Sequence, residues 1–118
     1  MSTNYPYKWV VLKITYKSEI IYKVLAGFAG GYLYGNSWQI NSGVESVEMH
    51  DDRICFNGFS GSKYICHPDS YGMNMDMQSV YDRIVSQQVD DYVVELLDKD
   101  TDWLELVDRT DKIDDNVV

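Results

Sequence analysis

Polar and apolar residues alternate over two neighbouring stretches near the start of the chain. Residues 9–16 are rich in β-branched and aromatic side chains with a period of two, which is typical of a strand with one buried face. Residues 17–19 have the composition of a turn, and the alternation resumes over residues 20–28. The pattern therefore predicts a β-hairpin.

Short apolar runs separated by turn residues continue to about residue 67. Asp51 and Asp52 separate one pair of runs, and the glycine-containing segment 58–62 separates another. Short strands at this spacing favour an antiparallel meander. The further strands that we expect are residues 38–41, 44–49, 53–57 and 63–67.

The apolar period changes from two to between three and four after residue 76. This spacing is typical of an amphipathic helix, which Asn74 or Asp76 would cap at its N-terminus. We favour a single helix that continues to about Asp98. The alternative ends the helix near Gln88 and makes residues 92–97 a strand, because Tyr-Val-Val is β-prone.

These elements predict an α+β fold: an antiparallel β-meander sheet with one amphipathic C-terminal helix packed on one face. A last strand is expected over residues 103–107. The chain forms a single domain over 1–118, in which residues 1–7 and 109–118 are expected to fray. The expected core comprises Val10, Leu12, Ile14, Val24, Trp38, Val47, Ile54, Phe56, Ile84, Val85, Leu96 and Leu97.

The net charge of -9 lies entirely in residues 71–118, whereas residues 1–70 are neutral. A field of this sign repels phosphate backbones and anionic lipid, and no stretch approaches the about 20 apolar residues that span a bilayer. We therefore expect no direct nucleic-acid binding, no membrane contact and a basic protein surface as partner, and self-association into a homo-oligomer stays open. The residues expected to bind that partner are Asp91, Glu95, Asp98, Asp100, Asp102 and Glu105.

The soft metal ligands of the chain are two cysteines and two histidines. If residues 57–63 close a symmetrical hairpin, Cys55 lies opposite Ile65 and Cys66 opposite Ile54, with the two sulfurs on opposite faces of the sheet. This register predicts two buried free thiols, no disulfide, no metal site and no cofactor. Two cysteines in a chain of this size also indicate a reduced, cytoplasmic location.

An Asp-x-Asp-x-Asp pattern at residues 98–102 matches the start of a calcium-binding loop. The sixth position holds Trp103 where the loop needs glycine, and the twelfth holds Arg109 where it needs glutamate. We therefore expect a solvated turn there. No group of residues has the spacing of a catalytic motif, and no catalytic residue is expected.

The glycine-punctuated segment 27–41 carries several aromatic residues beside its glycines. Such a loop can form a shallow pocket for a planar ligand such as a nucleotide. This gives an alternative function, a small-molecule binding or sequestering protein. The ligand-binding residues would then be Tyr32, Tyr34, Trp38 and Asn41.

Three stretches between residues 23 and 67 carry a resemblance. They are Lys-Val-Leu-Ala-Gly-Phe-Ala-Gly-Gly-Tyr, Gly-Asn-Ser-Trp-Gln-Ile-Asn-Ser-Gly-Val and Asn-Gly-Phe-Ser-Gly-Ser-Lys-Tyr-Ile-Cys-His. This part of the chain resembles small, acidic, uncharacterised accessory proteins of large tailed bacteriophages. The resemblance implies a non-enzymatic protein that binds and inhibits or redirects a host protein, in the host cytoplasm, and it transfers no site residues.

Overall fold

The computed structural model describes residues 2–28 and 37–107, and the expected fraying of residues 109–118 lies outside this range. The protein is a mixed α/β structure that consists mostly of strands in antiparallel sheets. Its elements are β1 (Thr3–Asn4), β2 (Lys8–Tyr16), β3 (Glu19–Phe28), β4 (Ser37–Ile40), β5 (Val44–His50), β6 (Arg53–Gly58), β7 (Lys63–Cys66), η1 (Pro68–Ser70), α1 (Met75–Ser86) and β8 (Tyr92–Leu96).

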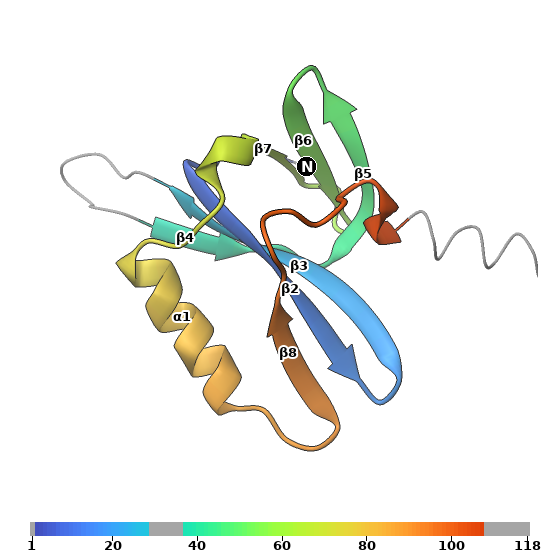
Figure 1. Cartoon of the computed structure of the whole chain (residues 1–118), viewed down its shortest axis with the longest axis vertical. Coiled ribbons are helices and arrows are strands. Elements are labelled where there is room, and N and C mark those ends of the chain that lie inside the picture. The colour runs from blue at the N-terminus through green and yellow to red at the C-terminus, as the bar shows by residue number, and fades with distance from the viewer. Residues whose placement is uncertain (1, 29–36, 108–118) are drawn as a thin grey trace, which may run out of the picture.

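The strands form two four-stranded sheets, not the single meander that the sequence predicted. One sheet has the order β4-β3-β2-β8 and is called the middle sheet below. The other has the order β1-β7-β6-β5 and is called the outer sheet. Figure 1 shows α1 on one side of the middle sheet and the outer sheet on the other.

Strand β2 explains why there are three layers. Val10, Leu12 and Ile14 pack in a buried cluster with Met77 and Val80 of α1. The alternate residues Trp9 and Val11, on the opposite face of the strand, pack in a second cluster with residues of the outer sheet. The continuous apolar run 9–12 is therefore buried on both faces, which is typical of a strand in the middle layer.

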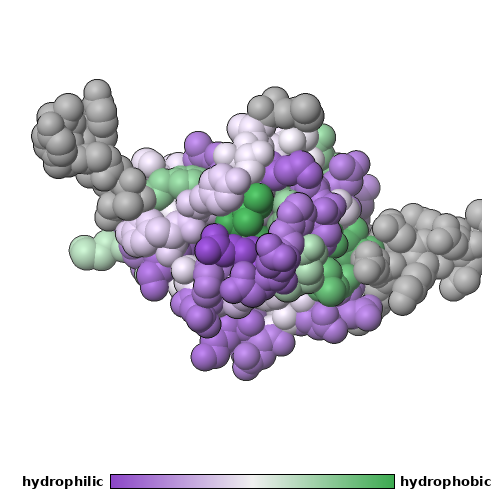
Figure 2. Space-filling model, turned by 90° about the horizontal axis from the view of Figure 1, so that it is seen from above, coloured by the Kyte–Doolittle hydropathy of each residue, from purple (hydrophilic) through white to green (hydrophobic). Residues whose placement is uncertain are grey.

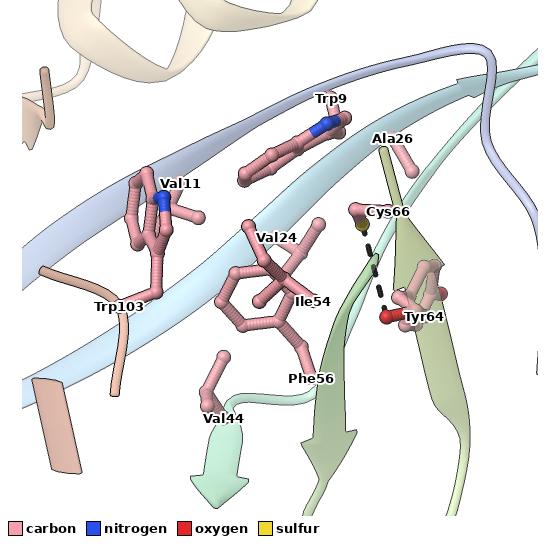
Figure 3. Close-up of a cluster of buried hydrophobic side chains, with 10 residues drawn as sticks. All are labelled: Trp9, Val11, Val24, Ala26, Val44, Ile54, Phe56, Tyr64, Cys66 and Trp103. Carbon is pink, nitrogen blue, oxygen red and sulfur yellow. Dashed lines mark hydrogen bonds between the residues drawn. The ribbon is translucent and has the colours of Figure 1, made fainter. Parts of the chain in front are cut away.

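Aromatic side chains fill much of the space between the two sheets. Figure 3 shows side chains of the middle sheet pointing toward those of β6 and β7, with Trp103 closing the cluster. The ring centroid of Trp9 lies 5.4 Å from that of Phe56, 4.7 Å from that of Tyr71 and 5.3 Å from that of Trp103. The Trp9 indole N–H donates to the carbonyl of His67 at 2.8 Å, so the buried ring has a polar partner.

The prediction of a single helix to about Asp98 is wrong, and the alternative, a shorter helix followed by a strand, is confirmed. Helix α1 begins after the N-cap Asn74, whose side chain accepts from the Met77 N–H at 2.8 Å, and it ends at Ser86. The following segment returns as strand β8, in register with β2, so that Ile14 lies opposite Val94. A strand here completes the backbone hydrogen bonding along β2, which helix propensity does not take into account.

Several core and strand predictions for the second half also need correction. Residues 103–107 form a turn and the start of a helical turn, not a strand, because Trp103 inserts between the sheets. Leu96, expected in the core, is 41% exposed on edge strand β8. Trp38, likewise expected in the core, is 41% exposed on edge strand β4. Val47, Ile84, Val85 and Leu97 are only partly buried.

The predicted hairpins are confirmed, and so is the register predicted for the hairpin that carries the two cysteines. β2 pairs with β3, β5 with β6 and β6 with β7, all antiparallel. Residues 3 and 4, part of the segment expected to fray, form the short strand β1, parallel to β7. Within residues 2–28 and 37–107, no helix has both the length and the apolar character to cross a bilayer.

The chain changes sheets between β4 and β5 with a three-residue link. Its last residue, Gly43, has a φ of 139°, a conformation that side chains rarely adopt. A Cβ atom at this position would also lie 2.7 Å from Ile21 Cδ1 and 2.9 Å from Phe59 Cδ2. Glycine therefore permits the chain to turn away from β3 and enter the outer sheet.

Candidate functional site

The six acidic residues expected to bind a partner follow one another along β8 and the loop after it. We call Asp91, Glu95, Asp98, Asp100, Asp102 and Glu105 the acidic strip. All six are exposed, as predicted, but they do not form the row along a helix that the sequence suggested. Asp91 precedes β8, Glu95 lies on it, and the others extend from its end to the turn around Trp103.

No member of the acidic strip makes a salt bridge within the part of the chain that the structure describes. The described contacts between basic and acidic side chains are His50–Glu48, Arg53–Asp52 and His67–Asp69, and all of them lie elsewhere. Lys99 is the one basic residue between positions 88 and 105, against seven acidic ones. The strip is therefore a surface of negative charge without a salt bridge among the described residues, although Lys13 lies opposite Glu95 in the pairing of β2 with β8.

The aspartates at 98–102 build a turn. The carboxylate of Asp98 accepts from the Asp100 N–H at 2.9 Å, and its carbonyl accepts from the Thr101 N–H at 3.1 Å. This explains the Asp-x-Asp-x-Asp pattern as local turn chemistry. Among residues 2–28 and 37–107, no group of three or more histidine, cysteine or acidic side chains is placed to hold a metal ion.

Exposed apolar side chains accompany the acidic strip. Val93 and Leu96 on β8 and Leu104 in the turn are each about two fifths exposed, and they alternate in sequence with the acidic residues. Leu104 also lines a cavity formed by residues 99–104 together with Met49, Ile54 and Pro68. Val93 and Leu96 point to opposite faces of the middle sheet because three positions separate them along β8, so a partner would reach both only by contacting the edge of this strand.

The structure does not assemble the alternative ligand site within the described residues. Tyr32 and Tyr34 lie outside them. Trp38 is half-exposed on β4, whereas Asn41 is buried just beyond that strand. The Asn41 side-chain oxygen accepts from the Val24 N–H at 2.9 Å, and the backbone N–H of Asn41 donates to the Val24 carbonyl at 3.1 Å. Asn41 therefore continues the pairing of β3.

The two cysteines are free and buried, in the predicted register. Cys55 lies opposite Ile65 and Cys66 opposite Ile54. The Cys66 thiol points between the sheets and donates to the Tyr64 carbonyl (Figure 3), while the Cys55 thiol donates to the Asn57 side chain. Burial raises the pKa of both thiols, which disfavours the thiolate that nucleophilic chemistry requires.

A polar network covers part of the outward face of the outer sheet. The Glu48 carboxylate accepts from His50 Nε2 at 2.8 Å and from the Asn57 amide at 3.3 Å, and these two hydrogen bonds lower the pKa of Glu48. Lys63 Nζ donates to the Asn57 carbonyl oxygen at 3.2 Å. Each polar group finds a partner in its neighbours, so we assign the network a structural role.

Sequence reasoning missed an exposed apolar edge at the start of β3. Ile20 and Phe59 are more than half exposed, and Ile21 lies beside them. Cavities of about 270 and 380 Å³ lie here, and all three residues line both of them. A phenylalanine inside the Gly-Phe-Ser-Gly turn was the available signal, because turns seldom expose a large aromatic residue without a contact for it.

Comparison of the chain with protein-family models, with curated proteins and with solved structures finds no match.

Proposed function

We propose that this protein is a non-enzymatic interaction module that binds a basic protein surface through the acidic strip. The observation that carries the proposal is the absence of salt bridges to all six carboxylates within the described residues. A partner with lysine or arginine side chains would supply the missing counter-charges. The exposed Val93, Leu96 and Leu104 would supply the apolar contacts.

The resemblance to phage accessory proteins suggests the kind of partner. It favours a protein of the bacterial cytoplasm, which this chain would inhibit or redirect. Binding through opposite charges gives fast association at low ionic strength, because the fields of the two surfaces steer their encounter. Such steering suits a protein that competes for its target with other cellular components.

The test uses three forms of the tagged full chain in a bacterial lysate. The first is wild type. The second is D91K/D102K/E105K, which reverses three strip carboxylates that make no side-chain hydrogen bond within the described residues. The third, E45K/D51K/D76K, is a matched control, because it changes the net charge equally at exposed carboxylates outside the strip that likewise make no side-chain hydrogen bond or salt bridge within the described residues.

We expect wild type and the control to capture the same protein, and the strip variant to lose it. Association with the captured protein, measured by surface plasmon resonance, should slow steeply as the salt concentration rises. The reason is that the Debye length, over which charges act on each other, falls from about 30 Å at 0.01 M to about 10 Å at 0.1 M. Equal capture by all three forms, or an association rate indifferent to salt, would reduce the strip to a solubility device.

A further inference from the structure

The first half of β3 is an unpaired strand edge. Strand β4 pairs with β3 only from Leu25 to Phe28, and Asn41 extends this pairing to Val24. Before that point, β3 is paired only with β2 among the described residues. We call Glu19–Lys23 the edge segment. Figure 1 shows it on the outside of the β2–β3 hairpin, beyond the point where β4 ends.

The alternation of backbone groups shows which hydrogen bonds this edge offers. The N–H and C=O of Val24 point away from β2, because both are bonded to Asn41. Alternate residues of a strand direct their backbone groups to the same edge, so those of Tyr22 and Ile20 also point away from β2. Within residues 2–28 and 37–107, these groups of Ile20 and Tyr22 have no hydrogen-bond partner.

Apolar surface lies on both faces of the sheet at this edge. A cavity of about 270 Å³ is lined by Tyr22, Val44 and Leu106, and one of about 380 Å³ is lined by Ile14, Tyr16 and Tyr92. Figure 2 shows hydrophobic residues exposed next to the point where the described chain ends. The last described residues, Leu106 and Val107, line the first of these two cavities. A strand added at the edge would place alternate side chains over each of these surfaces.

The sequence of the edge segment is complementary to itself. When two copies of Glu19-Ile20-Ile21-Tyr22-Lys23 are aligned antiparallel about Ile21, each Glu19 lies opposite a Lys23. Each Ile20 then lies opposite a Tyr22, an aromatic and β-branched pair of the kind that stabilises sheets. The same register makes Ile20 and Tyr22 a hydrogen-bonded pair, which is what their outward-pointing backbone groups require.

From these observations we propose that the protein forms a symmetric dimer through the edge segment, in which two middle sheets join into one continuous sheet. Charges at an edge usually prevent such pairing. Here Glu19 of one copy lies opposite Lys23 of the other across the two-fold axis, so the charges that meet are opposite in sign. The segment itself belongs to the neutral part of the chain, residues 1–70, and Tyr22 lines a cavity together with Asp102 and Glu105 of the acidic strip.

The decisive experiment uses two charge variants of the full chain. Glu19→Lys places lysines opposite each other, and Lys23→Glu places glutamates opposite each other. Because each dimer contains the contact twice, either change should raise the dimer Kd by about tenfold. Sedimentation velocity over a concentration series up to the millimolar range measures this change.

Mixing the two variants provides the matched control. In the mixed pair both contacts again join opposite charges, and its total charge equals that of two wild-type chains. We therefore expect native mass spectrometry to show a one-to-one heterodimer, and E19K/K23E to dimerise like wild type. Glu19 is exposed and Lys23 is half-buried, and neither side chain makes a hydrogen bond or a salt bridge within the described residues.

Hydrogen exchange locates the interface. The amides of Ile20 and Tyr22 should exchange rapidly in the monomer and become protected as wild type dimerises. A wild-type chain that stays monomeric throughout, single variants that dimerise as tightly as wild type, or a mixture that forms no heterodimer would each overturn the proposal. A monomer that instead pairs this edge with an extended segment of another protein would overturn it as well.

Discussion

The middle and outer sheets have the same number of strands but different surroundings. The middle sheet is covered by α1 on one face and by the outer sheet on the other, whereas the outer sheet packs on its inner face alone. Four consecutive residues of β2, 9–12, are therefore buried by packing on both faces. In β6, Ile54 and Phe56 face the aromatic cluster, while Cys55 between them lies beside Asn57 of the polar network. The comparison indicates that the fold depends mainly on the two interfaces of the middle sheet.

The largest effect should come from emptying the interface between the sheets. Trp9→Ala removes a fully buried ring that contacts Phe56, Tyr71 and Trp103. We expect the free energy of unfolding to fall by about 3–5 kcal/mol in urea denaturation. Tyr5→Ala, which removes a mostly exposed ring, should change it by less than about 0.5 kcal/mol. Similar losses for the two variants would contradict the layered arrangement.

A smaller effect should follow the loss of one hydroxyl in the same interface. The Tyr71 hydroxyl donates to the Leu97 carbonyl and accepts from the Val11 N–H, so it connects the residue after η1 to β2 and to the residue after β8. Tyr71→Phe leaves these backbone groups without a partner and should lower the free energy of unfolding by about 1–3 kcal/mol. Tyr16→Phe, at an exposed ring, should change it by less than about 0.5 kcal/mol.

The same hydroxyl gives a pH dependence with a definite sign. Burial raises the pKa of Tyr71 to about 12. The folded state therefore holds this proton more tightly than the unfolded chain, in which tyrosine titrates near pH 10. Its contribution to stability is complete below about pH 10 and is lost as the pH rises toward the folded pKa. Between about pH 10 and 12, the free energy of unfolding should fall less steeply with pH for Tyr71→Phe than for wild type. Identical slopes for the two proteins would refute the raised pKa of Tyr71.

The smallest effect should distinguish the two faces of the outer sheet. Cys66→Ser places a hydroxyl in the apolar cluster between the sheets and should lower the free energy of unfolding by about 1 kcal/mol. Cys55→Ser places it on the opposite face, beside the Asn57 side chain, which can accept its hydrogen bond. This variant should unfold close to wild type in the same assay. A greater loss at Cys55 would reverse the assignment of the faces.

Local pattern was enough to predict the hairpins and the register of the cysteines. Each depends on short-range alternation and on turns such as Asp51-Asp52, which determine the pairing within a few residues. The buried Val10, Leu12 and Ile14 were found for the same reason. The exposure of the acidic strip followed from composition, because unpaired carboxylates are rarely buried.

Long-range contacts were beyond the reach of the same reasoning. Alternation assigned β2 one buried face, although the apolar run of Trp9 to Leu12 could have signalled two. Helical periodicity continued through residues 87–97, where pairing with β2 decides the conformation. Trp103 was assigned to a strand, since no local pattern shows that its ring inserts between two sheets. The edge segment became visible only once β4 was seen to stop short of it.

The position of Trp103 has a consequence for how the chain is made. Trp9 leaves the ribosome early, but the rings that enclose it follow at intervals, with Phe56 and Tyr71 first and Trp103 last. Until translation has passed residue 103, the nascent chain exposes a hydrophobic surface that its final partner will cover. Contacts so distant in sequence slow folding and prolong the exposure of such surfaces. The nascent protein should therefore depend on chaperones more than its small size suggests.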